Sequence, residues 1–245
     1  MQVALMIDRL DFLDWLNIFC VVWFLACWIS YSQFAKVMAK KTHSLSSVLH
    51  FYRIDWMQRM LTREQRVADA SLISNLERNV NFFASTTLLI LAGLLTALSA
   101  TDSAFTVLER LPFAIPVSAT ALQLKLLVLV GVFVYAFFTF TWSMRQYNFC
   151  SALLGAAPMP DDEGVSAAER ERYARLTAKV IDQAAHSYNY GLRSYYFSMS
   201  ILAWFVSPWL FIGAVAFVVA VLYWREFCSK PLQTMLKIQT LDAKD

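Results

Sequence analysis

Four long stretches without a charged residue constrain this chain more than any other feature. They cover residues 15–35, 79–101, 126–144 and 194–224. A helix needs about 20 apolar residues to cross the hydrocarbon core of a bilayer. One such stretch could be a buried helix of a soluble protein, but four in one chain indicate membrane spans. We predict an all-α integral membrane bundle with about four transmembrane helices, at about 15–37, 79–100, 122–144 and 194–224.

The distribution of Lys and Arg predicts the orientation of these spans. Residues 36–78 carry eight and residues 145–193 carry six, whereas residues 102–120 carry one. Because cytosolic loops are enriched in Lys and Arg, we expect the connections 38–78 and 145–193 to lie in the cytosol. This orientation puts the N-terminus outside a bacterial inner membrane and, after four spans, the C-terminus outside as well. The C-terminal segment fits poorly, because it carries Arg225, Lys230, Lys237 and Lys244.

Pro208 interrupts the last span and leaves two arrangements open. A re-entrant segment would return the C-terminus to the cytosol, whereas a single long helix kinked at Pro208 would leave it outside. Residues 195–207 are too few for a full crossing at about 1.5 Å per residue. We therefore expect one kinked helix over residues 194–224.

Two capping boxes predict where the cytosolic helices begin. Thr62 is followed by Gln65, and Ser166 by Glu169, a pattern in which the two side chains cap each other's backbone amides. We expect one helix to run from Thr62 through the second span and another from Ala167 to Val206. The second and fourth spans would then extend well into the cytosol.

Residues 44–61 combine apolar side chains with Arg53 and Arg59. This pattern fits a helix lying on the membrane surface and equally a helix packed between spans. In neither case does the cytosolic part hold a separate folded domain. We therefore treat residues 1–245 as a single membrane domain.

Polar side chains gather at the cytosolic ends of three predicted spans. On the second span Glu77, Asn81 and Ser85 share one helix face, because they repeat every four residues. The candidate mouth or gate consists of Glu77, Arg78, Asn79, Asn81, Ser85, Arg145, Asn148, Asp182, His186, Asn189 and Arg193. These residues could handle an ion, a lipid headgroup or a small anion. They could also form a hydrogen-bond network between helices, and we favour the network.

The sequence has none of the motifs that identify an enzyme or a cofactor site. A P-loop, a Rossmann glycine pattern, HExxH and GxSxG are all absent, and the four cysteines form no CxxC pair. The three histidines lie outside the predicted spans, which argues against haem ligation between helices. We therefore expect a protein that is not an enzyme, with no catalytic residue, no metal, no cofactor and no nucleic-acid partner.

Two sequence runs resemble a known family. They are ERNVNFFAST at residues 77–86 and YNYGLRSYYF at residues 188–197, the second followed by Trp204 and Pro208. These runs are similar to those of the domain-of-unknown-function 599 family, and the resemblance covers most of the chain, from the first span to the fourth. It implies a multi-span membrane protein of bacterial type and implies no activity.

Two classes of function remain open. Hydroxyl groups on the second and third spans, next to the polar side chains, favour an oligomeric channel or transporter for a small ion or solute. Because four helices leave little room for a pore, we expect it on the axis of a homo-oligomer. The alternative is a non-catalytic scaffold or regulatory subunit that docks partners on helices 62–78 and 167–193. In both cases the lipid bilayer is a partner, and anionic lipid would be attracted to the cytosolic basic residues.

Overall fold

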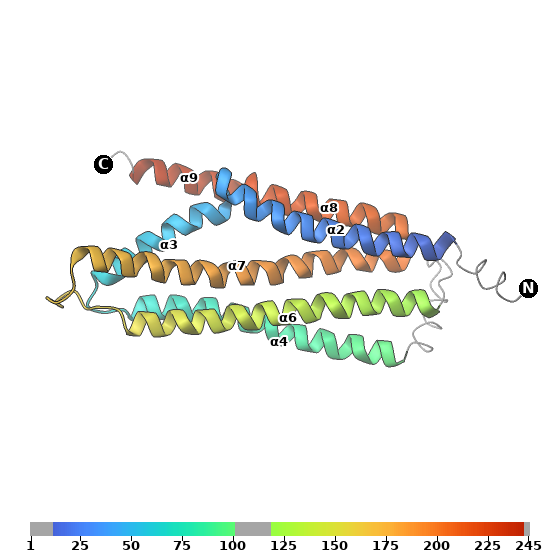
Figure 1. Ribbon diagram of the computed structural model, residues 1–245, viewed down its shortest axis with the longest axis horizontal. Helices are drawn as coiled ribbons and strands as arrows, with labels where there is room; N and C mark the ends of the chain where they lie inside the picture. The colour runs from blue at the N-terminus through green and yellow to red at the C-terminus, as the bar shows by residue number, and fades with distance from the viewer. Residues whose placement is uncertain (1–11, 101–118, 243–245) are drawn as a thin grey trace, which may run out of the picture.

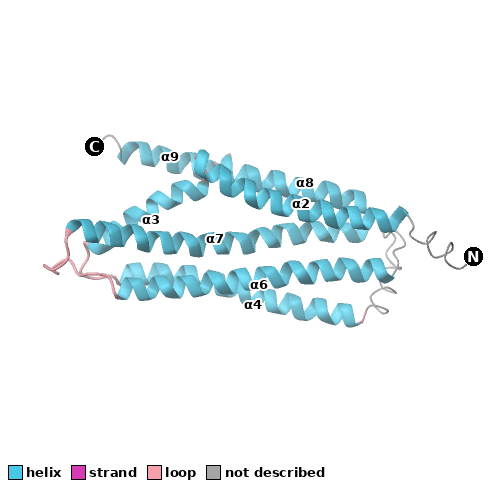
Figure 2. Ribbon diagram, viewed as in Figure 1, coloured by secondary structure: helices cyan, strands magenta, loops and turns pink. Residues whose placement is uncertain are grey.

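The computed structural model describes residues 12–100 and 119–242, and every regular element within them is a helix (Figure 2). In chain order they are α2 (Phe12–Lys41), α3 (Leu45–Leu61), α4 (Val67–Ser99), α6 (Ala119–Gly155), α7 (Ala167–Val206), α8 (Pro208–Phe227) and α9 (Lys230–Asp242). Four segments are long and apolar enough to cross a membrane, namely Trp15–Ala39, Val67–Ser99, Thr120–Gly155 and Pro208–Gln239. The predicted fold class, an all-α bundle with four long apolar spans, is confirmed.

The helices form an elongated bundle (Figure 1). Helix α6 packs along both α4 and α7, while α2 packs along α8 on the other side of α7. The shorter α3 leaves the end of α2 obliquely and packs against the first half of α7. The contact between α3 and α7 shows that residues 44–61 form a packed helix, which was one of the two predicted alternatives.

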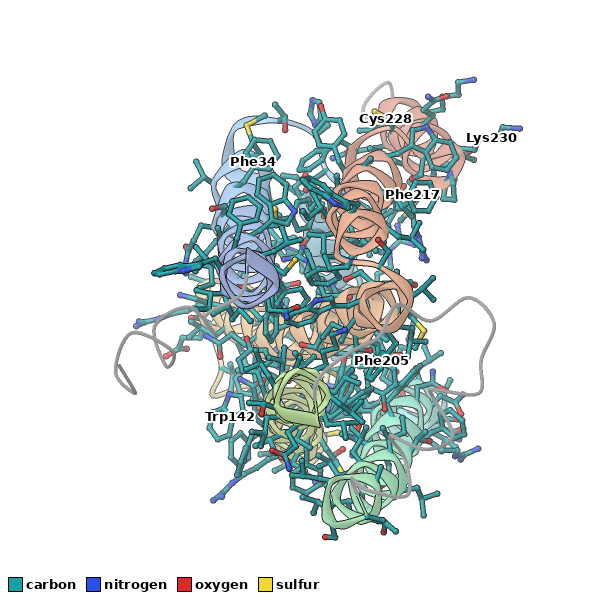
Figure 3. All side chains as sticks on the ribbon, turned by 90° about the vertical axis from the view of Figure 1, so that its right-hand side faces the viewer. Phe34, Trp142, Phe205, Phe217, Cys228 and Lys230 are labelled. Atoms are coloured by element: carbon teal, nitrogen blue, oxygen red, sulfur yellow. The ribbon has the colours of Figure 1, made fainter. Side chains whose placement is uncertain are left out.

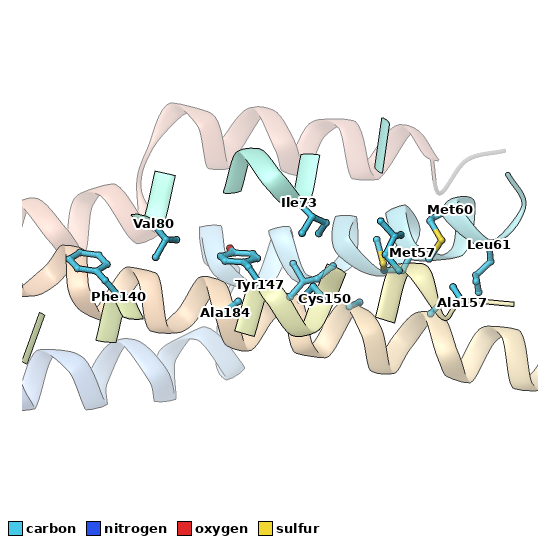
Figure 4. Close-up of a cluster of buried hydrophobic side chains, with 14 of the residues drawn as sticks. Met57, Met60, Leu61, Ile73, Val80, Phe140, Tyr147, Cys150, Ala157 and Ala184 are labelled. Atoms are coloured by element: carbon cyan, nitrogen blue, oxygen red, sulfur yellow. The ribbon is translucent and has the colours of Figure 1, made fainter. Parts of the chain in front are cut away.

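Two apolar clusters hold the bundle together. The first joins α3, α4, α6 and α7 around Met57, Ile73 and Phe140 (Figure 4). The second joins α2, α6, α7 and α8 around Phe24 and Trp204. Because each cluster draws on several helices, α7 is buried along most of its length although its first half is rich in charge.

The prediction of one helix kinked at Pro208 is wrong, because α7 and α8 are separate helices that lie antiparallel. Ser207 between them is extended, with φ −159° and ψ 139°, and Pro208 is the first residue of α8. Arg225 donates a hydrogen bond to the hydroxyl of Tyr196, 29 residues earlier. In one continuous helix that separation would be about 43 Å.

The reversal follows from the chemistry of proline. Pro208 has no N–H to continue the α7 hydrogen-bond ladder, but its fixed φ suits the first position of a new helix. The ladder acceptor it leaves free, the Trp204 carbonyl, accepts a hydrogen bond of 2.8 Å from the buried Lys125 Nζ. The Trp204 and Phe211 rings stack across the turn with centroids 4.8 Å apart.

The reversal also changes the predicted position of the C-terminus. Helix α7 adds a pass along the bundle between α6 and α8, so α9 ends at the opposite end of the molecule from the start of α2 (Figure 1). The predicted arrangement, in which four spans leave both termini on one side of the membrane, did not include this additional pass of α7. The hydroxyl of Tyr52 in α3 donates to the Met235 carbonyl at 3.1 Å, which places α9 beside α3.

The predicted helix starts had different outcomes. The capping box at Ser166 is confirmed, since Ser166 Oγ accepts from the Glu169 N–H at 3.3 Å and the Glu169 carboxylate accepts from the Ser166 N–H at 2.8 Å. The capping box at Thr62 is wrong. Thr62 instead ends α3, where its hydroxyl donates to the Arg59 carbonyl at 2.8 Å. Helix α4 begins only at Val67, without a side-chain cap.

Candidate functional site

A cavity of about 750 Å³ lies where α2 ends, α3 begins and α8 ends, against the middle of α7. Its wall contains all three histidines of the sequence, His43, His50 and His186. A single chain thus brings polar side chains from four helices, together with Gln146 of α6, around one hollow.

The start of α3 shapes this cavity. Ser44 caps α3 through a reciprocal pair of hydrogen bonds with Ser47, which allows the chain to turn sharply after α2. The Ser46 N–H donates to Glu226 Oε1 at 3.3 Å and so ties the start of α3 to the end of α8. A helix start carries N–H groups without helical partners and a partial positive charge, which favours anions.

The buried carboxylate of Asp182 on α7 binds two side chains of α3. Arg53 Nη1 donates to Asp182 Oδ1 at 2.6 Å, and His50 Nδ1 is hydrogen-bonded to Asp182 Oδ2. Two residues of α3 therefore hold α7 through one carboxylate. Because Arg53 balances its charge, Asp182 contributes little negative charge to the cavity.

His186 lies one turn beyond Asp182 on α7 and is exposed to the cavity. Partial burial between the surrounding helices is the largest cause of its lowered pKa, which Asp182 and Glu226 oppose and Arg53 and Arg193 strengthen. The imidazole is therefore neutral at pH 7, and it can donate through one nitrogen and accept through the other.

Lys36 and Arg193 supply the fixed positive charge of the cavity. The Arg193 guanidinium lies over the rings of Tyr31 and Tyr190, at 5.4 and 5.5 Å from their centroids. Among the residues that the structure describes, no carboxylate forms an ion pair with Arg193. The charged side chains of the wall itself balance, with Lys36 and Arg193 against Asp182 and Glu226. Because Arg53 adjoins the wall and pairs with Asp182, the cavity together with this neighbour carries one excess positive charge and is net positive.

Aromatic side chains close the bundle beyond the cavity. Tyr31 is buried one turn before the cavity-lining end of α2. One turn earlier on α2, the Trp28 ring lies edge-on to the Tyr135 ring, with the ring centroids 5.2 Å apart. Phe24 and Phe197 follow, with ring centroids 5.9 Å apart. The cavity is thus a pocket beside the middle of α7, and these rings lie between it and the end of the bundle where α2 begins.

The structure separates the predicted mouth into two groups. Asp182, His186, Asn189 and Arg193 of α7 all line the cavity. The predicted residues of α4 and α6 lie outside its wall, and most of them are exposed on the outer face of the bundle: Glu77, Arg78, Asn79, Asn81, Ser85, Arg145 and Asn148. The reason is that α4 packs along α6, whereas the cavity forms on the opposite side of α7.

Several cavity residues were not predicted. Lys36 and His50, which line the cavity, and Arg53, which pairs with Asp182 beside it, stand on helices whose packing partners the sequence pattern does not specify. Glu226 reaches the cavity only because α8 folds back, and the prediction of a continuous last helix excluded this. The i, i+3 spacing of His50 and Arg53 was the one available signal, since it places both side chains on one face of α3.

The comparisons with known proteins identify a family. Neither a curated protein nor a solved structure matches the chain. A family model, described as protein of unknown function, DUF599, matches residues 19–231 and so covers both the bundle and the cavity. This match agrees with the resemblance carried by residues 77–86 and 188–197. The chain belongs to the DUF599 family of multi-span helical membrane proteins.

Proposed function

We propose that this protein is a membrane transport protein whose cavity binds a small anion at the cytosolic end of the bundle. The observation that carries the proposal is a net positive cavity, lined by four helices and closed on its inner side by aromatic rings. A pocket that faces one side and is sealed toward the other suits a carrier that alternates between two states. It suits a permanently open pore less well.

Charge supports the proposed orientation. With α8 folded back, Arg225 at the end of α8 and Lys230 and Lys237 of α9 lie on the side of the bundle where α3 packs. The basic connections 38–78 and 145–193 leave the bundle on that same side. All these cations would then lie in the cytosol of a bacterium, as the positive-inside rule requires. The N-terminus would lie outside and the C-terminus inside.

Polar side chains on α4 support assembly into a homo-oligomer. Asn81 and Ser85 are exposed on the outer face of α4, within a candidate membrane span. Facing lipid, the Asn81 amide would lack hydrogen-bond partners, whereas a second copy could supply them. In this arrangement each chain has its own cavity, and the oligomer places several cavities in one assembly.

Exposed apolar side chains favour scaffolding as a second candidate function. Val67 and Leu72, near the start of α4, and Leu176, in the first half of α7, are exposed toward the end of the bundle that we place in the cytosol. Apolar side chains on a cytosolic helix can dock a partner protein. A scaffold role alone gives no reason for the net positive cavity, so we rank it second.

Anion-dependent stabilisation of the purified protein tests the proposed function. Melting temperatures would be measured with chloride, phosphate, sulfate or acetate at constant ionic strength, with gluconate as the reference anion. At least one anion should raise the melting temperature, since a ligand that binds only the folded state stabilises it. Arg193→Gln and Lys36→Gln should each weaken this response. Arg145→Gln, which removes an exposed cation outside the cavity, should keep it. Equal responses to all anions would contradict the proposal.

A further inference from the structure

A second hollow, of about 510 Å³, lies beside the cavity, between α3, α7, the end of α8 and the start of α9. The two hollows share Ser46, Asn189, Arg193 and Glu226, which form the partition between them. The second hollow, which we call the α8–α9 groove, is not needed for the proposed transport and has its own chemistry.

Basic side chains dominate the charge of the α8–α9 groove. Arg193, Arg225 and Lys230 line it, and Glu226 is the one carboxylate in its wall. Arg53 also lines the groove, but its charge is balanced by an ion pair with Asp182, which lies outside the groove wall. Arg225 is held in place by its hydrogen bond to the Tyr196 hydroxyl and by the Tyr196 ring, 5.2 Å from the guanidinium. The groove therefore presents excess positive charge on positioned side chains.

An unsatisfied hydroxyl marks the same groove. Ser229 directly precedes α9, lines the groove and is only 8% exposed. Its Oγ has no hydrogen-bond partner among the residues that the structure describes. A serine before a helix ordinarily caps one of the first N–H groups of that helix. Because a buried hydroxyl without a partner is destabilising, Ser229 points to a ligand that supplies one.

The surroundings of the groove indicate what kind of ligand this is. Trp224 lines the groove and is exposed, as is Phe217 two turns earlier on α8. Seen along the bundle, Phe217 in the middle of α8 and Lys230 at the start of α9 lie on the same outer side (Figure 3). Exposed aromatic side chains beside cations at the end of a span are typical of the membrane interface. A ligand seated here has its charged part in the groove and apolar surface beside it.

We propose that the α8–α9 groove binds the phosphate headgroup of an anionic phospholipid. Arg225 and Lys230 pair with the phosphate, the Ser229 hydroxyl donates to one of its oxygens, and the acyl chains lie along α8 past Trp224 and Phe217. Pairing of a phosphate with guanidinium and ammonium groups gives short, charge-assisted hydrogen bonds. An apolar wall beside the cations favours a lipid over free phosphate.

Native mass spectrometry of the detergent-solubilised, full-length protein tests this proposal. The protein would be titrated with short-chain phosphatidylglycerol, with phosphatidylcholine of the same chain length, and with inorganic phosphate. Phosphatidylglycerol should bind at least about tenfold more tightly than phosphatidylcholine. Removal of one groove cation should weaken the binding of phosphatidylglycerol about fivefold.

The variants separate the groove from general surface charge. Within residues 12–100 and 119–242, neither the Lys230 ammonium nor the Ser229 hydroxyl forms a hydrogen bond or ion pair to another helix, so Lys230→Gln and Ser229→Ala should leave the fold intact. Both should weaken the binding of phosphatidylglycerol, as should Arg225→Gln, and the exposed-cation control Arg145→Gln should not weaken it.

Equal binding of the two lipids, or an equal loss of phosphatidylglycerol binding in the control, would overturn the proposal. So would tight binding of inorganic phosphate that depends on Lys230, because it would identify a free-phosphate site. Since Arg225, Lys230 and Ser229 line only the groove, failure here leaves the transport proposal standing.

Discussion

Asp182→Asn should loosen the attachment of α3 to α7 and thereby open the wall of the cavity. The Asp182 side chain is 9% exposed and that of Arg53 is 18% exposed, so the substitution leaves a largely buried guanidinium without its counter-charge. Removing one partner of a fully buried ion pair costs about 3–5 kcal/mol. Since Arg53 retains some contact with water and asparagine can still accept one hydrogen bond, we expect about 2–3 kcal/mol at this site.

Thermal unfolding in detergent, followed by intrinsic fluorescence, measures this effect. For a chain of this size, 1 kcal/mol shifts the melting temperature by about 2–4 °C, so the variant should melt about 4–12 °C lower. The matched control is Glu171→Gln, which breaks an exposed pair with Arg175 on the same helix as Asp182. Exposed pairs contribute little, so the control should melt close to the wild type. Equal melting temperatures for the two variants would refute the assigned role of Asp182.

Three further substitutions and one control test the packing and the pH response. Gly191→Ala would place a Cβ 2.5 Å from the Phe140 ring, and overpacking should lower stability by about 1–3 kcal/mol in the same melting assay. Gly131→Ala, where nothing lies within 4 Å, should not lower it. Lys125→Met leaves the last-turn carbonyl of α7 without its buried donor and should destabilise by about 1–3 kcal/mol, measured by resistance to a protease. Burial lowers the pKa of His186, so protonation opposes folding, and stability should fall as the pH drops below the ordinary value of 6.5. Melting curves from pH 7.5 to 5 should show a smaller fall for His186→Gln.

The sequence was sufficient to predict the fold class, because long runs without a charged residue indicate helices that are surrounded by lipid. It also predicted the start of α7, since the Ser166 capping box depends only on residues close together in the chain. Thr62 has the same local pattern, yet its hydroxyl ends α3 instead. The outcome there is decided by the packing of α3, which the local pattern does not contain.

The reversal at Pro208 could not be predicted from length alone. Residues 195–207 are too few to span a membrane, but α7 begins at Ala167 and therefore uses part of its charged half to reach the far end of the bundle. That charged half is tolerated because it is packed against α3 and α6. The excess of Lys and Arg after residue 224 was the one sequence signal for the reversal.

The candidate site was predictable along α7 and unpredictable elsewhere. The spacing of Asp182, His186, Asn189 and Arg193 places these side chains on one face of a helix, and that face lines the cavity. The same reasoning for Asn81 was correct about its helix face but could not show which way that face points. Spacing within a helix does not specify the neighbouring helix, and that neighbour decides which residues share a cavity.

Uptake of the stabilising anion into proteoliposomes tests the central claim most directly. Vesicles would contain the wild type, Arg193→Gln or the Arg145→Gln control, reconstituted at equal protein content. We predict uptake above that of protein-free vesicles for the wild type and the control, and a strong loss for Arg193→Gln. Uptake no greater than that of protein-free vesicles, or equal uptake with Arg193→Gln, would contradict transport through the cavity.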